Sequence, residues 1–143
     1  MTAMNFEVSV DIAAAPETVW ATLADVERWP EWSASMSDVQ RLGDGPFGVG
    51  GAARVRQPRL PPTVWRVTEW RPGASFTWVA TGPGVTTTAG HRLTPTATGV
   101  TVVLSFDQRG PLAPVIDLLL GRLTRRYVGM EAAGLKRRCE TAG

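Results

Sequence analysis

The sequence is poor in the residues that build redox and metal sites. Cys139 is the single cysteine among 143 residues, so an internal disulfide cannot form. His91 is the single histidine, and one histidine with one distant cysteine cannot supply the four ligands of a zinc site. The G-x-S-x-G motif of many hydrolase nucleophiles is also absent from the sequence. We therefore expect neither a metal nor another cofactor.

Long apolar runs are absent too. No stretch of the sequence approaches the roughly 20 apolar residues that span a bilayer. The first residues lack the basic and apolar segments of a signal peptide. These observations predict a cytoplasmic protein without membrane insertion, and the length suits a single domain over residues 1–143.

Neither basic nor acidic side chains are in large excess. Fifteen basic side chains against 13 acidic ones leave a formal net charge of +2, although the pI is about 9.3. The basic residues form no cluster with aromatics apart from residues 136–138, where cations suit a helix C-terminus, so we predict no nucleic-acid partner. Residues 1–47 hold eight acidic and two basic side chains, an asymmetry that could pair elements of the fold or the subunits of a homodimer.

The first forty residues combine a strand with two short helices. Apolar and polar side chains alternate over residues 6–12, which is the period of a strand with one buried face. Pro16 suits the first turn of a helix, where its missing N–H costs nothing. Pro30 forbids one continuous helix through the tryptophans on either side of it. The predicted order is therefore strand, helix and a second, proline-broken helix.

A glycine-rich stretch follows at residues 43–51. It contains G-x-G-x-x-G at Gly43, Gly45 and Gly48, but that motif binds a dinucleotide only when a helix follows. An alternating strand over residues 53–57 follows instead, and Pro58 comes directly after it. We therefore do not assign a dinucleotide site.

The rest of the chain predicts an antiparallel meander and a final helix. Turn signals separate strands expected over residues 63–70, 75–81, 85–93 and 100–106. Apolar residues at three-and-four spacing predict one amphipathic helix over residues 112–140. Three glycines interrupt this helix, and they indicate either close packing on the sheet or space for a ligand.

This order of elements, with several short motifs, resembles the polyketide cyclase/dehydrase-like proteins of the START/Bet v1 superfamily, also called SRPBCC. The motifs are Ala15-Pro16-Glu17-x-Val19-Trp20, Trp29-Pro30-x-Trp32, Trp65-x-Val67-Thr68-Glu69, Pro72-Gly73-x-x-Phe76-x-Trp78 and Arg126-Tyr127-Val128-x-x-Glu131. The resemblance implies an α+β helix-grip fold. In that fold a curved antiparallel sheet of six or seven strands, with two short helices after its first strand, grips a long C-terminal helix around a cavity. It also implies that residues 43–51 form a loop at the mouth of the cavity.

The candidate site residues follow from this fold. Six tryptophans are unusual for 143 residues, and we expect about half of them to line a pocket suited to flat, apolar ligands. Trp65 and Val67 share one face of their strand, and Trp70 falls on the other. His91 and Tyr127 are the predicted catalytic pair, because the phenol needs a hydrogen-bond partner that His91 or a ligand carbonyl could supply. The predicted ligand-binding residues are Trp32, Gln57, Trp65, Val67, Trp78, His91, Leu119, Leu123 and Tyr127.

Three functions remain open at this point. The first is the binding or transport of a small hydrophobic molecule, such as a polyketide, an aromatic compound or a lipid. The second is a cyclase or dehydratase in which His91 and Tyr127 move protons without a metal or nucleotide cofactor. The third is a protein-interaction module similar to the co-chaperones of this fold, and the fold alone does not decide among the three.

Overall fold

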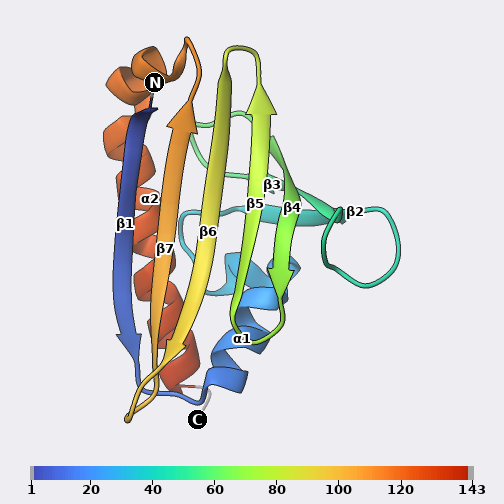
Figure 1. Ribbon diagram of the computed structural model, residues 1–143, viewed down its shortest axis with the longest axis vertical. Helices are drawn as coiled ribbons and strands as arrows, with labels where there is room; N and C mark the ends of the chain where they lie inside the picture. Colours follow the sequence, from blue (N-terminus) through green and yellow to red (C-terminus); the bar gives the residue numbers. More distant parts are fainter. Residues whose placement is uncertain (1, 142–143) are drawn as a thin grey trace.

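The computed structural model describes residues 2–141, which form one antiparallel sheet and three helices (Figure 1). The elements are β1 (Thr2–Ile12), α1 (Pro16–Ala24), the 3-10 helix η1 (Val26–Glu31), β2 (Asp38–Leu42), β3 (Ala52–Arg56), β4 (Thr63–Arg71), β5 (Ser75–Gly82), β6 (Val85–Pro95), β7 (Val100–Arg109) and α2 (Ala113–Thr141). The strand order is β1-β7-β6-β5-β4-β3-β2, so the first strand pairs with the last. The helix-grip fold predicted from the sequence is confirmed.

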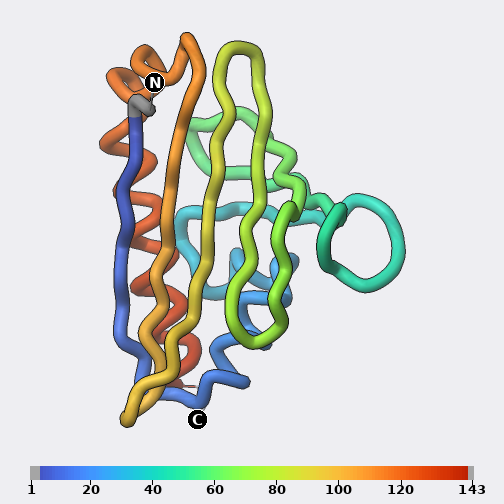
Figure 2. The backbone as a smooth tube through the Cα atoms, viewed as in Figure 1, coloured from blue at the N-terminus to red at the C-terminus, as the bar shows by residue number. Residues whose placement is uncertain are grey.

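Local sequence signals place the early elements as expected. Ile12 is buried at the end of β1 while Glu7 and Ser9 are exposed, which gives the strand one inner face. Pro16 is the first residue of α1, and Pro30 lies inside η1, whose 3-10 geometry replaces a continuous helix. The backbone tube shows α1 and η1 close to the C-terminal end of α2 (Figure 2).

The long helix α2 packs along β1 and against the residues that follow η1. Gly134 permits the closest approach, because a Cβ atom there would clash with the backbone carbonyl of Trp32. Gly129 has no atom within 4 Å of such a Cβ position. Of the two expectations for the helix glycines, close packing therefore holds at Gly134, and none of the three glycines lies on the cavity wall described below.

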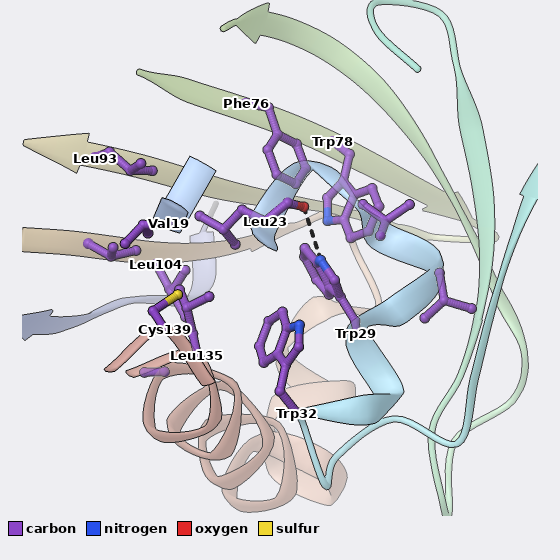
Figure 3. Close-up of a cluster of buried hydrophobic side chains, with 14 of the residues drawn as sticks. Val19, Leu23, Trp29, Trp32, Phe76, Trp78, Leu93, Leu104, Leu135 and Cys139 are labelled. Carbon is purple, nitrogen blue, oxygen red and sulfur yellow. Dashed lines mark hydrogen bonds between the residues drawn. The ribbon is translucent and has the colours of Figure 1, made fainter. Parts of the chain in front are cut away.

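The core centres on the indole of Trp29, which is fully buried (Figure 3). Its Nε1 donates a hydrogen bond of 3.0 Å to the carbonyl of Leu23, at the end of α1. The ring lies 5.2 Å from the ring of Trp78 and 5.4 Å from the ring of Trp32, measured between centroids. Trp29 therefore joins the two short helices to the inner face of the sheet.

A β-bulge in β4 corrects the predicted position of Trp70. Val67 pairs with Trp78, but Glu69 pairs with Thr77, so the register shifts by one residue between them. Trp70 consequently lies on the same face as Phe76, with ring centroids 5.4 Å apart, rather than on the outer face. Strict alternation along the strand could not reveal the extra residue.

The glycine-rich stretch also differs from its expected position. It runs directly into β3 without a helix, as the sequence predicts, and forms a loop that projects from the side of the sheet (Figure 1). Phe47 packs edge-on against Trp70, and Trp70 in turn contacts Trp20 and Phe76, which holds the loop to the side of the sheet. No residue of 43–51 lines the cavity, so the expectation of a loop at its mouth is wrong. Among the described residues, no helix is both long and apolar enough to cross a membrane.

Candidate ligand cavity

A cavity of about 570 Å³ lies between the inner face of the sheet and α2. Four groups of residues form its wall. They are Ser35 and Met36 after η1, Val55, Gln57 and residues 60–65 of β3, β4 and their connection, inward side chains of β5, β6 and β7, and Ile116, Leu120, Thr124, Tyr127, Val128 and Glu131 of α2. This volume is in the range of pockets that bind drug-sized molecules.

Two tryptophans form the flat part of the wall. The rings of Trp65 and Trp78 are stacked with centroids 5.7 Å apart and planes 29° from parallel. Trp78 is buried, whereas Trp65 is partly exposed. A stacked pair of this kind offers an apolar surface to a planar ligand. The other four tryptophans do not line the cavity. Trp29 and Trp32 are buried in the core, and the half-buried Trp20 and Trp70 pack against each other.

His91 lies on the cavity wall in a neutral form. Its ring stacks on Phe76 with centroids 4.1 Å apart, and Nδ1 lies 3.2 Å from the Phe76 carbonyl. Because a carbonyl can only accept, the ring proton is on Nδ1 and Nε2 keeps its lone pair. Burial lowers the pKa of His91 from 6.5 to about 4, and the hydrogen bond to Phe76 opposes this shift only in part. His91 is therefore uncharged at neutral pH.

Tyr127 has a different partner from the one we expected. Its hydroxyl donates a hydrogen bond of 2.5 Å to the carbonyl of Pro58, in the connection between β3 and β4. The bond ties α2 to this connection across the cavity. Since the phenol is already bonded to Pro58, the structure does not contain the proposed hydrogen bond between Tyr127 and His91.

Glu131 is a polar group on the wall that the sequence analysis missed as a site residue. It lies one helical turn after Tyr127 and is 93% buried, with 7% of its surface exposed. Burial raises the pKa of Glu131 from 4.5 to about 8, so at neutral pH the side chain is a protonated carboxyl that can donate a hydrogen bond. The sequence signal that could have identified Glu131 as a site residue is a carboxylate on the apolar stripe of α2.

Gln108 and Thr87 form a second polar group, which the sequence analysis also missed. They face each other across β7 and β6, and the Gln108 amide donates a hydrogen bond of 3.1 Å to the Thr87 hydroxyl. The Gln108 Oε1 atom is buried without a hydrogen-bond partner among the described residues. Burying a carbonyl oxygen unpaired is costly, so this atom is available to a donor inside the cavity.

The structure brings together five of the nine predicted ligand-binding residues. Those on the cavity wall are Gln57, Trp65, Trp78, His91 and Tyr127. The other four, Trp32, Val67, Leu119 and Leu123, are not on the wall. Trp32 and Val67 are buried in the core instead, and Leu119 is 73% exposed.

The helix residues were misplaced because the apolar stripe predicted for the helix is wider than the face that lines the cavity. The stripe includes Ile116 and Leu120 as well as Leu119 and Leu123, and the observed face follows Ile116, Leu120 and Thr124 at four-residue steps. Exposed leucines made the stripe look wider than the part that faces the sheet. Among residues 2–141, no group of three or more histidine, cysteine, aspartate or glutamate side chains is placed to hold a metal ion.

Solved structures of known proteins share this fold. An aromatase/cyclase from a Streptomyces species is 18% identical and superposes with a TM-score of 0.77, covering 96% of this chain and 93% of the other. A START superfamily protein from Mycobacterium smegmatis is 16% identical with a TM-score of 0.77, covering 97% of this chain and 99% of the other. A di-domain aromatase/cyclase of the steffimycin biosynthetic pathway is 14% identical with the same TM-score of 0.77, and this chain spans 52% of its length.

Comparisons of the sequence identify the family. An uncharacterised protein of Mycobacterium tuberculosis is 38% identical over 45 residues, which is 32% of this chain and 27% of that protein. This chain thus matches about a quarter of the length of that curated relative. The profile of the family described as "Polyketide cyclase / dehydrase and lipid transport" matches residues 3–140, nearly the whole chain. The chain therefore belongs to the polyketide cyclase/dehydrase and lipid transport family.

Proposed function

We propose that this protein binds a small, largely apolar ligand that carries a hydrogen-bonding carbonyl. The observation that supports this most is a 570 Å³ cavity that combines the stacked pair of Trp65 and Trp78 with uncharged polar groups. The neutral carboxyl of Glu131 is a donor for a carbonyl oxygen. The free Oε1 of Gln108 is an acceptor for a hydroxyl on the same ligand.

The expected affinity is moderate. A ligand of roughly 20 heavy atoms at about −0.3 kcal/mol per atom binds with about −6 kcal/mol, a Kd of tens of micromolar. A hydrogen bond from the Glu131 carboxyl to a ligand carbonyl adds about 1 kcal/mol, or about fivefold in affinity. Apolar contact supplies most of the binding, and the polar groups select among ligands of similar size.

Flavone and 2-phenyl-4H-chromene test this proposal, because the second compound keeps the ring double bond of flavone and has a CH2 group in place of the ring carbonyl. Isothermal titration calorimetry should give about fivefold tighter binding of flavone to the wild-type protein. Glu131→Leu removes the donor and should abolish this preference while binding of the chromene is kept. Equal affinity of the wild-type protein for both compounds would exclude the carbonyl contact. If neither compound binds, and native mass spectrometry of the purified protein finds no bound small molecule, the ligand-binding proposal is wrong.

A cyclase or dehydratase is the second candidate. The cavity presents both a protonated carboxyl at Glu131 and a neutral imidazole at His91, which are the two forms needed for general acid and general base catalysis. With a poly-β-ketone that cyclises to an aromatic product as substrate, Glu131→Gln should lower turnover by about 100-fold or more while substrate binding is kept. Turnover that is absent from the wild-type protein, or equal in the variant, would exclude this role for Glu131.

A further inference from the structure

Exposed apolar side chains gather at the start of α2, beside the opening of the cavity. We call this set the apolar tip; it consists of Leu112, Val115, Leu118 and Leu119, which are 47%, 50%, 84% and 73% exposed. Leu112 lies against Gly84 of the β5–β6 hairpin and, like Val115, is about half exposed. Leu118 and Leu119 are so exposed that burial within the chain does not account for them, and such a group of apolar side chains is typical of an interaction surface.

The tip borders the cavity on the side where its wall is open. Ile116 and Leu120 lie on the inner side of the same two helical turns and line the cavity. The exposed wall residues Pro61, Pro62 and Pro83 face them from the β3–β4 connection and from the β5–β6 hairpin. In Figure 1, the start of α2 and the β5–β6 hairpin lie together at one end of the molecule, opposite α1. A surface that covered the tip would therefore also cover the opening.

The charged residues next to the apolar tip indicate which charge a surface that covers it would carry. Residues 109–126 hold four arginines and one acidic residue, Asp117, which forms an ion pair with Arg125 at 3.4 Å. Arg122 and Arg126 are exposed and form no ion pair with any other residue that the structure describes. At the opposite end, the acidic side chains of residues 16–31 lie close to the basic residues 136–138 near the end of α2. The unpaired positive charge of Arg122 and Arg126 therefore lies directly beside the apolar tip.

We propose that this end of the molecule docks on the surface of an anionic lipid bilayer. Arg122 and Arg126 follow Leu118 by four and eight residues, about 6 and 12 Å along the axis of α2. An interfacial helix buries its apolar side chains about 5–10 Å deep, so the tip would reach the acyl boundary while both arginines stay at the anionic headgroups. The cavity would then open toward the bilayer, and its use for taking up a ligand there rests on the proposed function.

Co-flotation with lipid vesicles tests the proposal. The wild-type protein should float with vesicles of phosphatidylcholine mixed with phosphatidylglycerol, and less with phosphatidylcholine alone. Val115→Ser combined with Leu118→Ser should weaken binding about tenfold for each side chain. Arg122→Gln combined with Arg126→Gln should weaken it about fivefold for each arginine, only on the anionic vesicles. Added salt should reduce the anionic preference through screening.

Val49→Ser is the matched control, because Val49 is 69% exposed but lies in the glycine-rich loop. It should float like the wild-type protein. Failure of the wild-type protein to bind anionic vesicles would overturn the proposal, and so would undiminished flotation of the Val115→Ser/Leu118→Ser variant. Light scattering that shows a dimer of the wild-type protein and a monomer of this variant, without vesicle binding, would assign the tip to a second copy of the chain and also overturn it.

Titration with flavone in solution separates this proposal from the proposed function. Neither Val115 nor Leu118 lines the cavity, so their substitution should leave the flavone affinity unchanged. An unchanged flavone affinity also verifies that the variant is folded. Flavone binding without vesicle binding contradicts only the docking surface. Vesicle binding without flavone binding contradicts only the ligand cavity.

Discussion

The buried carboxyl of Glu131 should make the stability of the protein depend on pH in a narrow, predictable window. In the unfolded chain this group ionises with a pKa of 4.5, whereas burial raises its pKa to about 8 in the folded protein. Between these two values the folded state holds a proton that the unfolded state has released. Raising the pH through this interval therefore favours unfolding.

His91 opposes this effect in the lower part of the interval. Burial lowers the pKa of His91 from 6.5 to about 4, so between these two values the side chain is protonated in the unfolded chain but not in the folded protein. Lowering the pH there favours unfolding, and the contributions of His91 and Glu131 cancel between about 4.5 and 6.5. Above pH 6.5 both states hold His91 neutral, so the raised pKa of Glu131 governs the pH dependence.

At about 1.36 kcal/mol per pH unit, the free energy of unfolding should fall by about 2 kcal/mol between pH 6.5 and 8. Urea unfolding followed by far-ultraviolet circular dichroism measures this change. Glu131→Gln is neutral at every pH and should remove the slope, whereas Glu7→Gln, on the exposed outer face of β1, should retain it. A wild-type stability that does not change over this range, or an equal slope in the Glu131→Gln variant, would refute a buried, protonated carboxyl.

Four further variants test other contacts. His91→Phe keeps a ring in the stack but removes the group that opposes Glu131. The free energy of unfolding of this variant should therefore rise by about 3 kcal/mol as the pH falls from 6.5 to 4.5, whereas that of the wild-type protein should stay constant; urea unfolding measures both. Tyr127→Phe removes the hydrogen bond to Pro58 and should lower the Tm by about 3 °C in calorimetry; an unchanged Tm would contradict that bond. Gly134→Ala should lower the Tm because its Cβ meets a backbone carbonyl, whereas Gly129→Ala, in open space, should gain about 0.5–1 kcal/mol of stability.

The strands and their turns could be predicted because their signals are local. Proline and glycine mark the ends of β4, β5 and β6, and the alternation between them is regular enough to give each strand within a few residues. Pro16 similarly marks the residue at which α1 begins, and Pro30 explains why η1 is a 3-10 helix. The fold follows from these signals taken in order.

The positions of individual side chains could not be predicted with the same certainty. The bulge at residue 68 moves Trp70 to the inner face, and nothing in the sequence distinguishes that threonine from an ordinary strand residue. The rotation of α2 depends on which leucines the rest of the molecule leaves exposed. Glu131 was overlooked for the same reason, because its place on the cavity wall requires the orientation of the helix to be known.

The division of the six tryptophans gives the protein an internal optical reporter. Trp65 and Trp78 are stacked on the cavity wall, so the electronic transitions of their indoles are coupled and sensitive to anything that enters between wall and helix. Trp20 and Trp70 pack edge-on with centroids 5.1 Å apart, away from the cavity. Near-ultraviolet circular dichroism therefore includes a contribution from Trp65 and Trp78 that should change with occupancy and one from Trp20 and Trp70 that should not, which allows an unlabelled ligand to be followed without a dye.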